Sequence, residues 1–88
     1  MKLNTLSSSN GSGVTQQLEQ AILRELPGAT VRVRAGQPGH FDIHVTSEEF
    51  RGKSRLECQR RVYRSIASLM SGDRAPVHAV DRLETVVG

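Results

Sequence analysis

Residues 47–63 of this 88-residue chain read SEEFRGKSRLECQRRVY, and this stretch decides how the rest is organised. Ser47 and the two glutamates after it can cap a short helical turn, because carboxylates suit the positive end of the helix dipole. Gly52 breaks that turn, and Ser54 starts a longer helix that we expect to reach about Met70. The side chains expected on its inward face are Leu56, Tyr63, Ile66, Ala67 and Met70.

Three further patterns flank this stretch. Apolar side chains at helical spacing from Val14 to Leu26 predict a helix, which Pro27 and Gly28 stop. Residues 31–35 and 41–45 alternate apolar with polar side chains, as half-buried strands do, and residues 36–39 (GQPG) make a hairpin between them. Beyond the long helix, Pro76 forbids its continuation, and residues 77–87 read as a third strand of lower regularity.

The predicted order is therefore αββααβ, an α+β fold with helices packed on one face of a three-stranded mixed sheet. The connection through both later helices is long enough to return the third strand parallel to the second. One face of the hairpin is apolar, and the other carries Arg32, Arg34, Asp42 and His44.

The length of the chain allows one small domain, residues 14–88. Residues 1–13 are rich in Ser, Gly and Asn, so we expect a flexible tail or a cloning remnant.

A single cysteine excludes an internal disulfide, and no apolar run is long enough to span a bilayer or to act as a secretory signal. These features predict a soluble cytoplasmic protein. The net charge of +3 permits nucleic acid or acidic protein partners without demanding them.

Several short motifs together resemble the BolA-like family of stress morphogens and glutaredoxin partners, over roughly residues 14–84. The matching positions are the His-Phe pair at 40–41, Phe50, Gly52, the Ser-Arg pair at 54–55, Gln59, the Val-Tyr pair at 62–63 and Val-His-Ala at 77–79. The resemblance implies the class II KH fold. It also implies a non-enzymatic role in iron-sulfur cluster trafficking or iron homeostasis.

Two histidines are candidate metal ligands. If the second and third strands are adjacent and parallel, His40 and His78 open them at the same end of the sheet, on backbones about 4.8 Å apart. Neutral imidazole is a common metal ligand. The resemblance implies that His78 helps to ligate a shared 2Fe-2S cluster. His40 is the nearest second ligand, although the His-Phe motif leaves a structural role open, and His44 is expected to be solvated.

The chain cannot complete such a site alone, because iron-sulfur clusters usually take four ligands, mostly thiolates, and it has one Cys and three His. The resemblance implies a monothiol glutaredoxin as partner, with glutathione and a glutaredoxin cysteine as the other ligands. Without this partner we expect a monomer or weak homodimer. Cys58 is expected to be a small, semi-buried helix side chain.

A cluster of basic residues offers an alternative function. Six basic side chains within fourteen positions can form a positive stripe that meets phosphates: Arg51, Lys53, Arg55, Arg60, Arg61 and Arg64. A solvated helix face explains them equally well. The alternative is a DNA-binding transcriptional regulator of stress response and cell morphology. The GxxG at 36–39 joins two strands and so reads as a turn rather than the nucleotide clamp of KH domains.

Overall fold

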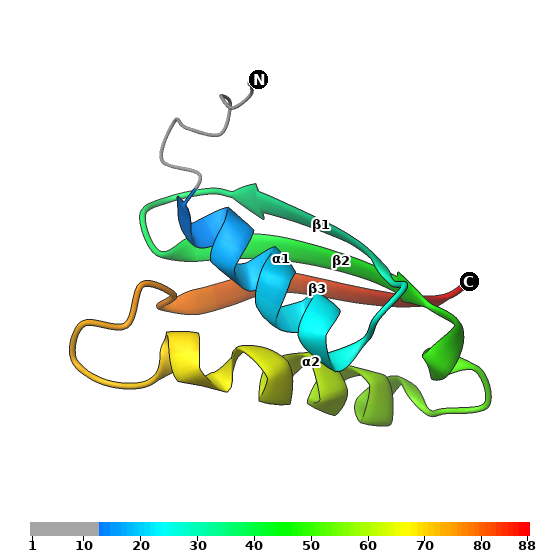
Figure 1. The fold of residues 1–88 in the computed structure, drawn as a ribbon. Helices are drawn as coiled ribbons and strands as arrows, with labels where there is room; N and C mark the ends of the chain where they lie inside the picture. The colour runs from blue at the N-terminus through cyan, green and yellow to red at the C-terminus, as the bar shows by residue number, and fades with distance from the viewer. Residues whose placement is uncertain (1–12) are drawn as a thin grey trace, which may run out of the picture.

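The computed structural model describes residues 13–88, so the tail expected at residues 1–13 lies, except for Gly13, outside the described part. The elements follow the predicted order (Figure 1): α1 Gly13–Glu25, β1 Thr30–Ala35, β2 His40–Ser47, the 3-10 turn η2 Glu48–Phe50, α2 Arg55–Met70 and β3 Ala79–Val87. The α+β fold expected from the sequence is confirmed.

The three strands form one mixed sheet in the order β1-β2-β3. β1 and β2 are an antiparallel hairpin, in which Ala35 lies opposite Phe41 beside the turn. β2 and β3 are parallel, as predicted, and their pairing begins with His40 opposite Ala79. The long connection through η2 and α2 therefore returns the chain to the end of the sheet at which β2 starts.

The parallel ladder contains one irregularity close to its start. Phe41 lies opposite Val80 and Asp42 lies opposite Arg82, so no residue of β2 lies opposite Asp81 in the backbone register. An extra residue on one strand is a β-bulge, which redirects the side chains around it. The sequence pattern predicted a less regular third strand, and the bulge is the reason.

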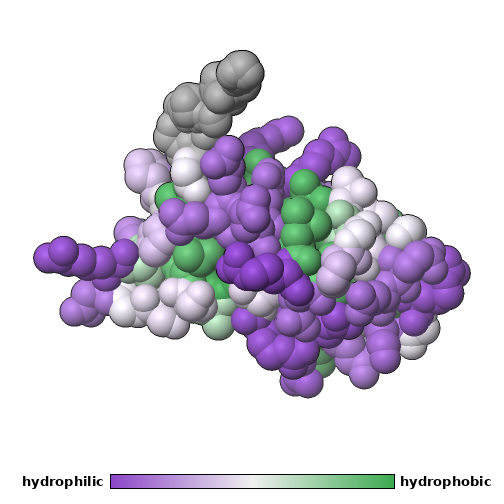
Figure 2. All heavy atoms as spheres, in the orientation of Figure 1, coloured by the Kyte–Doolittle hydropathy of each residue, from purple (hydrophilic) through white to green (hydrophobic). Residues whose placement is uncertain are grey.

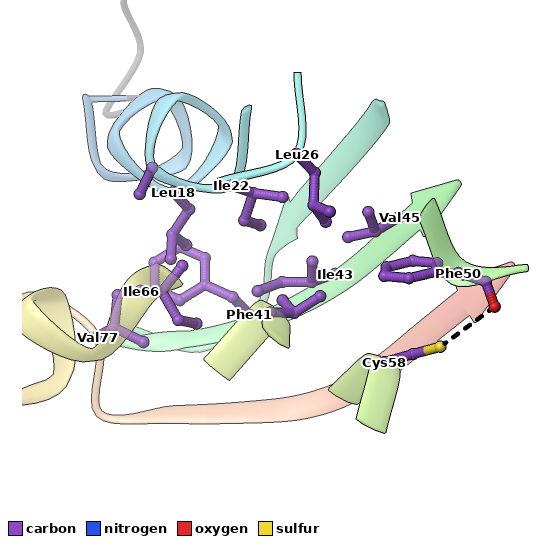
Figure 3. Packing of buried hydrophobic residues seen from close by; sticks show 12 residues of the cluster. Leu18, Ile22, Leu26, Phe41, Ile43, Val45, Phe50, Cys58, Ile66 and Val77 are labelled. Carbon is purple, nitrogen blue, oxygen red and sulfur yellow. Dashed lines mark hydrogen bonds between the residues drawn. The ribbon is translucent and has the colours of Figure 1, made fainter. Parts of the chain in front are cut away.

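Both helices lie on the same face of the sheet, and the core fills the space between the two layers (Figures 1 and 3). β2 is the central strand, and its alternate residues Phe41, Ile43 and Val45 are buried. Phe50 on η2 is 1% exposed and closes one end of this core. Burial of such side chains contributes roughly 1.5–3 kcal/mol each, which is how a small domain with few aromatics stays folded.

The cap predicted at Ser47 is present, and the structure adds a cap at Ser54, where the sequence predicted only the start of a helix. The Ser47 hydroxyl accepts the backbone N–H of Glu49 at 3.1 Å. The Ser54 hydroxyl accepts the N–H of Glu57, and the Glu57 carboxylate accepts the N–H of Ser54, which is a complete capping box. These contacts fix where α2 begins and therefore which of its sides faces the sheet.

The predicted inward face of α2 is only partly right. Ile66 is buried and Met70 packs partly against the core, whereas Leu56, Tyr63 and Ala67 are exposed. The α2 residues that are buried are Cys58, Val62 and Ile66. The helix is rotated from the predicted orientation because two of its sides carry apolar residues, and its packing against α1 and the sheet selects one of them.

The surface seen from the side of the helices is mainly hydrophilic or of intermediate hydropathy, with smaller hydrophobic areas among them (Figure 2). Within residues 13–88, no helix combines the length and the apolar character needed to cross a membrane.

Candidate functional site

His78 lies immediately before β3, on a short segment held at both sides. Val77 is 1% exposed, and its N–H donates to the carbonyl of Leu69 at 3.1 Å. The N–H groups of His78 and Ala79 both donate to the carbonyl of Gly39, at 2.8 and 3.1 Å. The His78 side chain itself is exposed. A fixed backbone therefore presents a solvent-accessible imidazole.

Gly39 also makes room for the His78 ring. A methyl group on the Gly39 Cα would lie 2.8 Å from Cγ and 2.9 Å from Nδ1 of His78, which is too close for any real side chain. Gly39 has φ +80, a left-handed conformation that other residues rarely adopt. This position therefore requires glycine for two separate reasons, and the sequence alone suggested only the turn.

His40 opens β2 directly after Gly39, so the two candidate histidines do start from neighbouring backbone at one end of the sheet. The His40 N–H donates to the carbonyl of Gln37, and its carbonyl accepts the N–H of Gly36, which fixes the hairpin turn. Its imidazole Nδ1 lies 3.0 Å from Oδ1 of Asp81, the bulged residue of β3. Sequence reasoning missed Asp81 entirely.

The remaining potential ligands are placed less favourably. Cys58 is 5% exposed, and its Sγ lies 4.0 Å from the carbonyl of Phe50 (Figure 3). The expected semi-buried cysteine is in fact buried. His44 is half-buried, with Nε2 3.7 Å from a carboxylate oxygen of Glu84. In residues 13–88, no three His, Cys, Asp or Glu side chains gather as a metal site. The described residues thus fit a cluster only as a partial ligand set, completed from outside.

The predicted basic stripe is partly neutralised within the fold. Arg51 pairs with Glu48 at 2.7 Å, and Arg64 lies 3.5 Å from Glu25. Arg61 donates to Glu25 at 3.2 Å and to Glu49 at 2.9 Å. The residues of the stripe that make no ion pair with a described residue are Lys53, Arg55 and Arg60.

These contacts shift the pKa values of the paired groups in the direction that favours their charged forms. The hydrogen bond from Arg51 is the main cause that lowers the pKa of Glu48, and the same contact raises the pKa of Arg51. The hydrogen bond to Glu49 raises the pKa of Arg61, against the opposing effect of burial. Half of the stripe therefore has its charge already engaged by carboxylates of this chain.

The polar face of the sheet, opposite the helices, carries a shallow hollow of about 360 Å³. It is lined by the four polar residues expected there from the alternation in the sequence, together with two from β3 and two apolar neighbours: Arg32, Val33, Arg34, Asp42, Ile43, His44, Arg82 and Glu84. Both signs of charge are present, so the hollow is not a uniformly positive surface.

These features define a class of small α+β domain. Its mixed three-stranded sheet is covered by helices on one face, and an exposed histidine precedes the last strand. The sequence profile of the BolA-like protein family matches residues 23–85, and the chain belongs to this family. A relative from Acinetobacter guillouiae, described as an uncharacterized protein in the rpoN-murA intergenic region, is 33% identical over 66 residues, which are 75% of this chain and 76% of the relative.

Solved structures agree with this assignment. A BolA homologue from Coxiella burnetii is 30% identical with a TM-score of 0.67, covering 83% of this chain and 88% of its own. Mouse BolA1 has the same fold, with a TM-score of 0.70 at 22% identity over 99% of this chain and 75% of its own. The BolA domain of SufE1 from Arabidopsis thaliana gives a TM-score of 0.64 at 19% identity, covering 85% of this chain and 92% of its own.

Proposed function

We propose that this protein binds a monothiol glutaredoxin and contributes His78 to a 2Fe-2S cluster shared between them. It would act in iron-sulfur cluster trafficking or iron homeostasis, without catalysing a reaction itself. The cluster is the cargo of the pair rather than a resident cofactor of the free chain. The single observation that carries the proposal is an exposed imidazole at position 78 on a backbone fixed by Gly39.

The groups of this chain that could ligate iron support a shared site. The one thiol of the chain is buried in the core, so thiolates must come from the partner and from glutathione. Imidazole in place of thiolate reduces the negative charge around a cluster and tends to raise its potential. A shared cluster should therefore differ in spectrum from one held by glutaredoxin and glutathione thiolates alone.

The test is to titrate cluster-loaded monothiol glutaredoxin with this protein and to record visible circular dichroism. We expect a new spectrum that saturates at a fixed stoichiometry and is lost with His78→Ala. His44→Ala is the matched control, because His44 is a half-buried histidine paired with Glu84 on the polar sheet face. An unchanged spectrum with the wild type, or an equal change with His78→Ala, would refute the proposal.

DNA binding is the second candidate, and the three unpaired basic residues of the stripe favour it. Lys53, Arg55 and Arg60 lie just before or within the first turns of α2 and make no ion pair within residues 13–88, although the charges of Lys53 and Arg60 act on the carboxylate of Glu57. If they contact phosphates, affinity should fall steeply with salt and weaken when all three are changed to Gln. Arg61 is left unchanged in this test, because it also joins Glu25 to Glu49 within the fold. Affinity that is insensitive to salt and to the triple change would remove this candidate.

A further inference from the structure

The bulge in β3 places one carboxylate where a regular strand would place none. Val80 and Leu83 both pack against the core, and between two successive inward-facing residues a regular strand would give the polar face of the sheet only one residue. The bulge gives it two, Asp81 and Arg82, and only Arg82 lies opposite a residue of β2 in the backbone register. The extra residue, Asp81, is the one whose carboxylate lies 3.0 Å from Nδ1 of His40.

This contact determines which nitrogen of His40 carries the proton. An ionised carboxylate can only accept hydrogen bonds, so the nitrogen facing Asp81 must be the N–H of a neutral ring. Nε2 then holds the lone pair. Among residues 13–88, Nε2 of His40 has no hydrogen-bond partner, and the side chain is 35% exposed. A histidine that ligates a metal usually donates its other ring N–H to such a carboxylate or carbonyl.

We infer that Asp81 is a positioning residue, which holds His40 in the tautomer protonated on Nδ1 and thereby offers Nε2 as the second nitrogen ligand from this chain. The ligand part of this inference rests on the proposed function, whereas the tautomer is a property of the free protein. At one end of the sheet there are thus two imidazoles, and a different contact fixes each of them. His78 is held through its backbone by Gly39, and His40 through its ring by Asp81.

A plain surface ion pair is the competing explanation, because both side chains are partly exposed and such pairs contribute only about 0–1 kcal/mol. The two explanations differ in the neutral state of the ring. In water the form protonated on Nε2 is the more populated for histidine, so a carboxylate that acts only on the protonated ring would leave that preference unchanged. A positioning carboxylate reverses it.

The tautomer is tested in the free protein labelled with ¹⁵N-histidine, by long-range ¹H–¹⁵N correlation well above the ordinary histidine pKa of about 6.5. We expect His40 to be protonated mainly on Nδ1, and Asp81→Ala to return it mainly to Nε2–H. Asp81 is exposed, so this variant should fold, which the amide spectrum checks. Glu84→Ala removes the carboxylate near His44 instead and should leave His40 unaffected. A wild-type His40 protonated mainly on Nε2 would overturn the inference.

The ligand part is tested with cluster-loaded monothiol glutaredoxin. We expect Asp81→Ala to change the visible circular dichroism of the mixed complex in the same direction as His40→Ala, and less than His78→Ala. A spectrum identical to wild type for Asp81→Ala would overturn the positioning role. If wild-type protein leaves the glutaredoxin spectrum unchanged, the proposed function fails and the ligand part falls with it. The tautomer measurement still decides the contact between Asp81 and His40 by itself.

Discussion

The imidazole of His78 packs directly against the Cα of Gly39, at a distance that leaves no space for even a methyl group. The same glycine accepts the His78 N–H through its carbonyl. Gly39, a residue of the hairpin turn, therefore fixes the positions of both the ring and the backbone of His78. The hairpin and the segment before β3 act as one unit at this end of the sheet.

Gly39→Ala should therefore displace the His78 ring and weaken its contribution to a shared cluster. The left-handed φ adds a strain of about 1–2 kcal/mol. Gly28→Ala has the same type of φ but open space around it, so it should cost similar stability without touching His78. Gly36→Ala has neither problem and should be nearly neutral. The His78 chemical shifts and the spectrum of the mixed complex report the outcome, and equal behaviour of Gly39→Ala and Gly28→Ala would contradict this account.

Arg61→Ala should destabilise the domain, because this side chain joins Glu25 of α1 to Glu49 of η2. It also donates to the backbone carbonyl of Glu25 at 3.4 Å. We expect a loss of about 2 kcal/mol in the free energy of unfolding, measured with urea, since the bonds are charge-assisted and partly buried. Arg60→Ala, at an exposed position that makes no ion pair with the described residues, should stay within about 0.5 kcal/mol of wild type. Similar losses for both variants would show that Arg61 is not a structural link.

Acid should weaken the start of α2 through Glu57. The backbone N–H of Ser54 is the main cause that lowers the pKa of Glu57 below its ordinary value of 4.5. The ionised form therefore stabilises the fold above pH 4.5, and this contribution disappears as the pH falls through the lower pKa of the folded state. Glu57→Gln can keep the capping box without a charge. The difference in unfolding free energy between wild type and Glu57→Gln should shrink on acidification, and parallel pH profiles would be evidence against this role.

Cys58→Ala should leave the cluster spectrum unchanged, because the thiol is buried and faces the carbonyl of Phe50. The small cavity should cost on the order of 1 kcal/mol in stability. Alkylation by iodoacetamide should be slow in the native protein and fast in urea. Loss of the mixed-complex spectrum in a folded Cys58→Ala protein would mean that this chain supplies a thiolate after all.

Much of the fold could be predicted from the sequence, because its signals are local. Gly52 and Ser54 mark the start of the long helix, the GQPG turn separates two alternating segments, and Pro76 ends any helix before β3. The parallel return of β3 also followed, since a connection of this length permits it. The helix start, the turn and the helix stop each depend on residues close together in the chain, and the length of the connection is read directly from the sequence.

The missed features depend on contacts between distant segments. Leu56 and Tyr63 align on one side of α2 as convincingly as Val62 and Ile66 do on another, and only packing against α1 and the sheet decides between them. The contact between His40 and Asp81 spans 41 positions and needs the bulge. The spacing of Val80 and Leu83, which breaks the period of two, was the signal that could have revealed that bulge.

The most direct test of the central claim is to look for a nitrogen of this chain bound to iron. Protein labelled with ¹⁵N-histidine would be mixed with unlabelled cluster-loaded monothiol glutaredoxin, reduced by one electron, and measured by pulsed electron paramagnetic resonance. We predict a strong ¹⁵N coupling from the labelled chain that includes a component lost in His78→Ala. A reduced complex without strong ¹⁵N coupling, or with the same couplings in His78→Ala, would contradict the account.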